Sequence, residues 1–283
     1  MAQTGGGYAS YKNRPSWRKN MVTSLKRDGM TWVTIDNCRR PMIYLDHCAL
    51  RDLSANEKFQ KKFLSVFQTK GTLCFSWMNF YDIGGNKEGP SVEHMKNFMK
   101  EIGENWFPIH WNPSKVMDNE KAGIHIPFAD ETFFCNYYPF IHGGSLTLNK
   151  AVELSLCPEV QAVRSKRMKQ LESFRDEINE CKDDPIRKCA AEKTFQRLEF
   201  HSSCPAVFVH DRLLSLIIKR KEKISNNDLI DFFHAVVSLS YADMVVLDSK
   251  WADYARQISI PKSGGKYYSV KDLERFLTDI ERI

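Results

Sequence analysis

Three chemical signatures are missing from this sequence. Although the chain contains eight cysteines, none of them forms a C-x-x-C pair, so it offers neither a zinc knuckle nor a redox motif. It has no Gly-rich phosphate-binding loop, because the pairs Gly84-Gly85 and Gly143-Gly144 are isolated turns. It also has no motif that marks a covalent nucleophile. These absences disfavour phosphatase and nucleotidyltransferase chemistry.

Long apolar runs are missing too. The nearest approach to one, Leu213 to Ile218, is far too short to cross a membrane. Residues 1–20 are polar and rich in glycine, without the apolar core of a secretory signal, so we expect no such signal. We therefore expect a cytoplasmic protein with reduced thiols and no membrane partner.

Size and charge set wide bounds on function. A chain of 283 residues buries a substantial core in one or two domains. Its hydrophobic content of 42% and charged content of 27% are ordinary for a globular protein. The net charge of +6 permits a nucleic-acid partner without requiring one.

In two stretches of the sequence, predicted strands and helices alternate in an α/β rhythm. In the first, apolar runs at residues 42–46 and 72–77 predict buried strands. Between them, residues 54–68 predict a helix with Ser54 as its N-cap and Glu57 completing a capping box. This strand–helix–strand order implies a parallel pair. In the second stretch, the predicted elements are a helix at 228–242, a strand at 243–248, a short helix at 251–257, a strand at 266–270 and a helix at 271–283.

The segments outside this rhythm differ in composition. The first forty residues are basic and aromatic, which favours a strap packed over the core and leaves a nucleic-acid-contacting arm as the alternative. In the middle of the chain, residues 106–111 predict one more strand, and residues 149–200 predict two helices broken near 183–185. The predicted plan is an N-terminal arm at 1–40, a core at 41–89 and 205–283, and a mainly helical insertion at 90–204.

Four aspartates have settings that indicate a shared site. Asp46 and Asp248 each end an apolar run, at the edge of a parallel sheet where ligands bind. One such aspartate is typically a turn or N-cap residue, but two in neighbouring strands favour a site. Asp82 follows the second apolar run, and Asp231 interrupts an almost wholly apolar helix. A carboxylate in such a helix needs a partner.

A hard divalent cation is the usual partner of buried carboxylates. Oxygen ligands suit Mg²⁺ or Mn²⁺ better than zinc. The acids therefore predict a metal-dependent phosphodiesterase. Its predicted catalytic and metal-binding residues are Asp46, Asp82, Asp231 and Asp248.

The neighbours of Asp231 have other predicted roles. Asp228 is assigned to helix capping, with Ser225 as the N-cap. His234 lies one turn beyond Asp231, where it is predicted to pair with that acid or to contact a phosphate. Glu120 is a candidate accessory acid, although a surface position is favoured. With His234, the residues predicted to hold a nucleic-acid backbone are Lys219, Arg220, Lys221 and Lys223, for which a solvated face is the equal alternative.

Four segments, in this order along the chain, resemble the motifs of PIN-domain nucleases. Two resemble strands that lead to an acid, one resembles the family's Asp-headed helix, strand and second Asp, and one resembles its closing strand and helix. The segments are residues 43–50, 75–82, 231–251 and 267–277. The resemblance implies a PIN-like three-layer α/β fold with a central parallel sheet and a large, mainly helical insertion.

The resemblance also implies an activity. A metal held by the aspartates would assist the hydrolysis of phosphodiesters by water, with RNA favoured over DNA as the substrate. It leaves room for a toxin-like or defence-related role, for a homo-oligomer and for an inhibitory protein partner. The chain departs from the family at two points. Asp82 stands where the family usually has Glu, and the gap from Asp82 to Asp231 is far wider than a minimal PIN domain has.

Two other functions compete with an endoribonuclease. One is a non-catalytic scaffold that keeps the fold and uses its basic surface or helical hairpin to bind nucleic acid or protein. The other is a flap-type DNA nuclease with a related sheet, although such enzymes usually carry more acids and a helical DNA-binding element. Loss of activity on chelation of the metal would separate both nucleases from the scaffold.

Overall fold

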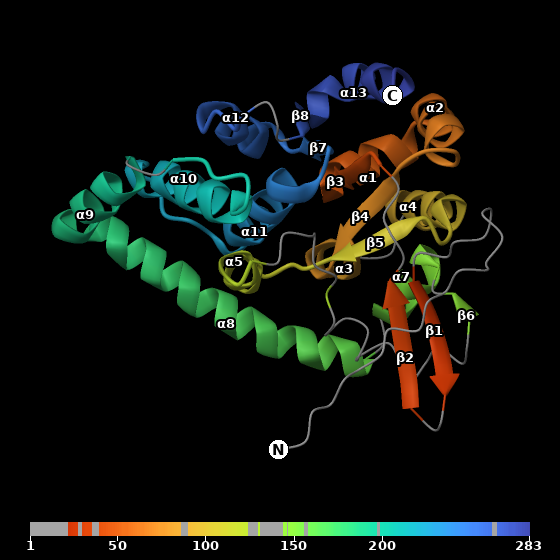
Figure 1. Ribbon diagram of the computed structural model, residues 1–283, viewed down its shortest axis with the longest axis horizontal. Coiled ribbons are helices and arrows are strands. Elements are labelled where there is room, and N and C mark those ends of the chain that lie inside the picture. The colour runs from red at the N-terminus through yellow and green to blue at the C-terminus, as the bar shows by residue number, and fades with distance from the viewer. Residues whose placement is uncertain are drawn as a thin grey trace.

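A single parallel sheet forms the centre of the molecule. The structure is a computed structural model that describes residues 22–27, 30–35, 40–85, 90–123, 130, 144–145, 147–155, 158–196, 199–261 and 265–283. The sheet has the strand order β5-β4-β3-β7-β8, and every neighbouring pair is parallel (Figure 1). The predicted α/β class with a central parallel sheet is confirmed. The strands are β3 (Met42–Leu45), β4 (Thr72–Ser76), β5 (Trp106–Ile109), β7 (Met244–Leu247) and β8 (Lys266–Ser269).

The strands form where the sequence has continuous apolar runs. Every residue of β3, β4, β5 and β7 is buried, as expected of strands covered on both faces. The edge strand β8 begins with the exposed Lys266 and ends buried. A charged start on an edge strand discourages pairing with another chain.

The strand order places a switch point between β3 and β7. From β3 the chain moves outward through β4 to β5, and it later returns to β7 and β8 on the other side of β3. Asp46 directly follows β3, and Asp248 directly follows β7. The backbone N–H of Asp46 donates to the carbonyl of Val246 at 2.9 Å. The two predicted acids therefore leave neighbouring strands at the edge where α/β sheets bind ligands.

Two groups of helices flank the sheet (Figure 1). In the first group, α1 packs on α2 and α4, α2 packs on α13, and α4 packs on α7. In the second, α11 packs on α5, α8, α10 and α12. The first group is α1 (His47–Ala55), α2 (Glu57–Phe67), α4 (Pro90–Ile102), α7 (Leu148–Ser155) and α13 (Leu273–Glu281), preceded by the 3-10 turn η2 (Val270–Asp272). The second is α5 (Pro113–Lys121), α8 (Pro158–Asp183), α9 (Pro185–Gln196), α10 (Pro205–Lys219), α11 (Asn226–Tyr241) and α12 (Ser249–Gln257), while α3 (Trp77–Gly85) contacts α1 and α7.

The helix starts agree only in part with those predicted from the sequence. The capping box of Ser225 and Asp228 at the start of α11 is confirmed. The predicted N-cap at Ser54 is wrong, because Ser54 lies inside α1 and its hydroxyl donates to the carbonyl of Arg51 at 3.0 Å. Asn56 caps α2 instead, accepting from the N–H of Phe59 at 3.2 Å. β3 passes almost directly into α1, so the first helix after β3 begins at His47, earlier than the predicted start at residue 54.

The segment between the two core stretches contributes to the sheet and adds a long helix. Its strand β5 is the sheet edge next to β4. The break near 183–185 is confirmed, since α8 ends at Asp183 and α9 begins at Pro185. The prediction of two helices over 149–200 is wrong, because α7 and α8 are separate and α9 follows them. In the part of the chain that the structure describes, no helix is both long and apolar enough to cross a membrane.

A second, small sheet is formed largely by the N-terminal segment. Its antiparallel order is β2-β1-β6, with β1 (Val22–Arg27), β2 (Met30–Ile35) and β6 (Gly144–Ser145). Residues 1–21, on which most of the predicted basic arm falls, lie outside the described residues.

Candidate metal centre

Asp46 and Asp248 are both N-cap residues at the switch point. Asp46 is 5% exposed and accepts from the backbone N–H of His47 at 2.7 Å. Asp248 accepts from the N–H of Trp251 at 2.8 Å and so starts α12. Capping fixes the direction of each carboxylate but satisfies only part of its hydrogen-bonding capacity. Both acids therefore combine the helix-capping role and a place at the sheet edge.

Asp82 is positioned through Asn79, a residue that the sequence analysis missed. Both lie on α3, three residues apart. The buried Asn79 side chain accepts from the N–H of Ser76 at 2.8 Å and donates to the carbonyl of Leu45 at 3.2 Å. It thus ties the ends of β4 and β3 to the start of α3. This tie sets Asp82 opposite Asp46, which directly follows Leu45.

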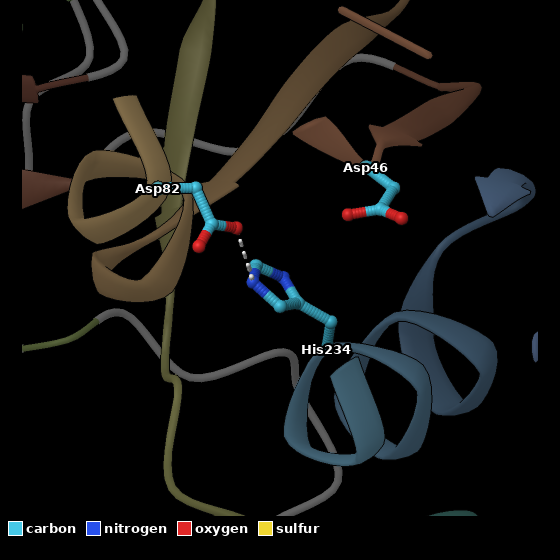
Figure 2. A group of neighbouring side chains, drawn as sticks. All are labelled: Asp46, Asp82 and His234. Atoms are coloured by element: carbon cyan, nitrogen blue, oxygen red, sulfur yellow. Dashed lines mark ion pairs between the residues drawn. The ribbon is translucent and has the colours of Figure 1, made fainter. Parts of the chain in front are cut away.

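Asp231 and His234 come from α11, which leads into β7. His234 is 3% exposed, and its Nε2 lies 3.5 Å from Oδ2 of Asp82 (Figure 2). Neither ring nitrogen of His234 has a hydrogen-bond partner among the described residues, so the predicted pairing of His234 with Asp231 is wrong. Burial lowers the pKa of His234 to about 3. The imidazole is therefore neutral at pH 7, so its approach to Asp82 is not a salt bridge.

Asp46, Asp82 and His234 form a group with the geometry of a metal site. One ligand atom from each lies within 4.8 Å of the others. Figure 2 shows the three side chains converging from the end of β3, from α3 and from α11. Two carboxylates and a neutral imidazole are established ligands of divalent cations. The residues therefore fit a metal ion.

The four predicted acids influence one another electrostatically. Burial, with Asp248 nearby, raises the pKa of Asp46 to about 6. Burial, with the charges of Asp46, Asp248 and Asp82, raises the pKa of Asp231 to about 8. The four carboxylates thus lie close enough to interact, but only Asp46 and Asp82 belong, with His234, to the group whose ligand atoms lie within 4.8 Å of one another, and Asp231 and Asp248 lie outside that group. Like charges in a buried site resist ionisation together, and a bound cation would offset that cost.

Two aromatic residues complete the surroundings. The buried hydroxyl of Tyr44 has no hydrogen-bond partner among the described residues, and its ring lies 5.6 Å from that of His234. The indole of Trp251 faces Asp231 and slightly opposes the rise in its pKa. That contact does not meet hydrogen-bond geometry, since Trp251 Nε1 has no such partner in the described chain. Because these buried polar atoms have no hydrogen-bond partner in the described chain, they can bond to a ligand held by the acids.

The other predicted residues lie apart from this centre. Arg220 and Lys223 line a neighbouring cavity, whereas Lys219 and Lys221 are exposed and do not line it. The favoured surface position of Glu120 is wrong. Glu120 is 1% exposed and accepts from the N–H groups of Ala206 at 2.8 Å and Val207 at 3.2 Å, and from the hydroxyl of Tyr241. Its partners lie far along the chain, so sequence spacing gives no sign of them.

Comparisons of this chain with family models, with curated proteins and with solved structures find no match.

Proposed function

We propose that this protein is a divalent-metal-dependent phosphodiester hydrolase that acts on nucleic acid. The observation that carries the proposal is the convergence of Asp46, Asp82 and His234 at the switch point of a parallel sheet. The resemblance to PIN-domain nucleases supports the same activity and favours RNA over DNA. The two helix groups around the sheet support a PIN-like three-layer arrangement.

The ligand set bears on which metal is bound. Asp46, Asp82 and His234 would hold the ion, with Asp231 and Asp248 beside them. Mg²⁺ strongly prefers oxygen ligands, whereas Mn²⁺ also accepts an imidazole nitrogen. Of the two ions expected from the acids, Mn²⁺ therefore fits better. When bound, such an ion activates water and offsets charge on a phosphate.

The protein's own residues supply position and environment. The capping hydrogen bonds of Asp46 and Asp248 hold their carboxylates at the sheet edge before substrate arrives. The buried rings of Tyr44 and Trp251 lie beside His234 and Asp231 and make this region low in dielectric. Interactions with a phosphate are stronger in such a low-dielectric region than at an open surface.

A cleavage assay with matched variants tests the proposal. Purified protein should cleave labelled single-stranded RNA with Mn²⁺ and lose that activity with EDTA. Asp46→Asn should reduce cleavage to background, because it removes one charged metal ligand. Asp52→Asn is the control, since Asp52 is a partly exposed residue of the helix that Asp46 caps, and its carboxylate pairs with Arg51 at 2.9 Å.

Each other outcome identifies a competing function. Cleavage of single-stranded DNA or flaps but not of RNA would favour the flap-type DNA nuclease. Binding of nucleic acid without cleavage under any metal would favour the non-catalytic scaffold. Equal cleavage by Asp46→Asn and the wild type would refute the metal centre.

A further inference from the structure

A basic cavity lies beside the candidate metal centre. Its volume is about 180 Å³, and α8, α10, the segment 220–224, α11 and α12 form its walls. Four cationic side chains line it against two carboxylates, so the lining carries a net positive charge. The cations are Lys182, Arg220, Lys223 and Lys250, and the carboxylates are Glu222 and Asp228.

The cavity wall is held in place by side-chain contacts between distant parts of the chain. Asn179 of α8 donates to the carbonyl of Ile224 at 3.2 Å and accepts from its N–H at 3.0 Å. One turn earlier, Arg175 donates to the side chain of Asn226 at 2.6 Å. These three hydrogen bonds fasten the long inserted helix to the start of α11. Lys182 is thereby carried to the cavity.

Two of the four cations are already paired with carboxylates. Lys223 pairs with Asp183 at 2.8 Å, and Lys250 pairs with Asp228. Within the described ranges, Lys182 and Arg220 have no carboxylate within ion-pair distance. Lys182 donates to the backbone carbonyl of Glu222, and the guanidinium of Arg220 lies 4.3 Å from the centre of the Tyr254 ring.

The unpaired cations sit against apolar walls. The buried side chains of Ile217, Ile224, Trp251 and Tyr254 also line the cavity. Low-dielectric walls beside charges of one sign concentrate the field and favour an incoming anion. Burial lowers the pKa of Lys182, with the nearby positive charges of Lys188 and Lys250 adding to that effect and Glu222 and Asp228 opposing it. An anion bound in the cavity would favour the charged form of Lys182 and so offset the effect of burial.

The cavity and the metal centre share a helix and a wall. Asp228 lines the cavity, and Asp231 and His234 follow at intervals of three residues along α11. Six residues of helix span about 9 Å along the axis, which is within the reach of one bound strand. Trp251 lines the cavity while its indole faces Asp231.

We propose that the basic cavity binds a backbone phosphate of the nucleic-acid strand whose neighbouring phosphate lies at the metal centre. The inference rests on the proposed hydrolase function and extends it to substrate binding. It gives the inserted helix α8 a role, because Lys182 reaches the strand from it. The guanidinium of Arg220 and the ammonium of Lys182 supply donors to the phosphate oxygens.

A binding assay without metal tests the cavity separately from catalysis. The full chain is titrated against a labelled single-stranded RNA in EDTA, over a series of salt concentrations. Lys182→Gln and Arg220→Gln should each weaken binding about tenfold, and each should lower the slope of log affinity against log salt by about 0.7. Lys193→Gln is the control, because Lys193 is an exposed cation of α9 and does not line the cavity. Thermal melts verify that all variants fold.

Competition by inorganic phosphate and steady-state kinetics of the cavity variants then test whether the cavity binds a phosphate of the substrate. Inorganic phosphate should compete with RNA for the wild type and much less for Lys182→Gln. With Mn²⁺, both cavity variants should raise KM about tenfold with little change in kcat. Unchanged affinity and KM in both variants, or equal competition by phosphate, would overturn the cavity proposal. If no form of the protein cleaves RNA but both cavity variants still bind it more weakly, the hydrolase proposal fails and the proposed phosphate site in the cavity is still supported.

Discussion

Replacing Asp231 by Asn tests whether the buried charge of Asp231 destabilises the folded protein. The carboxylate of Asp231 is mostly buried and faces the charges of Asp46, Asp248 and Asp82. Asn has nearly the same shape and no charge. Without metal, Asp231→Asn should therefore make the folded protein more stable, at the same time as it abolishes metal-dependent cleavage.

The size of the stability gain from Asp231→Asn depends on pH. The pKa of Asp231 is about 8 in the folded protein, compared with 3.8 for an unperturbed aspartate side chain. The folded state therefore holds the proton more tightly, and the wild type loses stability as pH rises from about 4 to about 8. Asn does not titrate. The stability gain of Asp231→Asn should be close to zero near pH 4 and largest above about pH 8.

The magnitude follows from the difference in pKa. At about 1.4 kcal/mol per pH unit, the two values set an upper bound of roughly 6 kcal/mol. Relaxation and water entry reduce such penalties, so we expect a gain of about 2–3 kcal/mol above pH 8. For a chain of this size, that corresponds to a rise in Tm of roughly 4–12 °C.

Thermal or urea unfolding in EDTA near pH 5 and pH 9 measures the effect. Asp228→Asn is the control on the same helix. Although burial acts to raise the pKa of Asp228, hydrogen bonds from Lys250 and Ser225 lower it, so its removal should destabilise the protein by about 1 kcal/mol. An equal gain for Asp231→Asn at both pH values, or no gain at pH 9, would refute the buried-charge argument.

Three further variants test the site and its supports. His234→Gln should weaken Mn²⁺ binding about 10- to 100-fold in calorimetric titrations, while unchanged binding would remove His234 from the ligand set. Asn79→Ala should cost about 2–4 kcal/mol in urea unfolding, because it leaves buried groups of Ser76 and Leu45 without their partner, and it should also lower kcat. Glu120→Gln should cost about 2–3 kcal/mol without changing RNA affinity, and an effect on affinity would contradict its purely structural role.

The sequence predicts the sheet well because its strands depend on local pattern. Each central strand is a continuous apolar run, and Asp46 and Asp248 end two of them. The order of parallel strands then determines that these acids are neighbours. The start of α2 was mispredicted because Ser54 and Asn56 are both good caps, and the choice between them depends on how directly β3 enters α1.

The site is predictable from the sequence only where a residue's setting is local. His234 follows Asp231 by one turn, but its approach to Asp82 depends on how α3 packs against α11. Glu120 finds its partners 86, 87 and 121 residues away. The basic cavity similarly depends on α8 crossing to the start of α11, which no pattern within α8 indicates.

The contrast between two kinds of buried polar residue argues that the acid cluster is functional. Glu120 and Asn79 are buried, and both polar ends of each side chain have hydrogen-bond partners. In these two residues the fold satisfies the polar atoms that tie distant segments together. Around the acids, the ring nitrogens of His234 and the hydroxyl of Tyr44 lack hydrogen-bond partners in the described chain, and Asp231 resists ionisation. Because such costs persist mainly where they serve a site, these unpartnered atoms support the proposed metal centre.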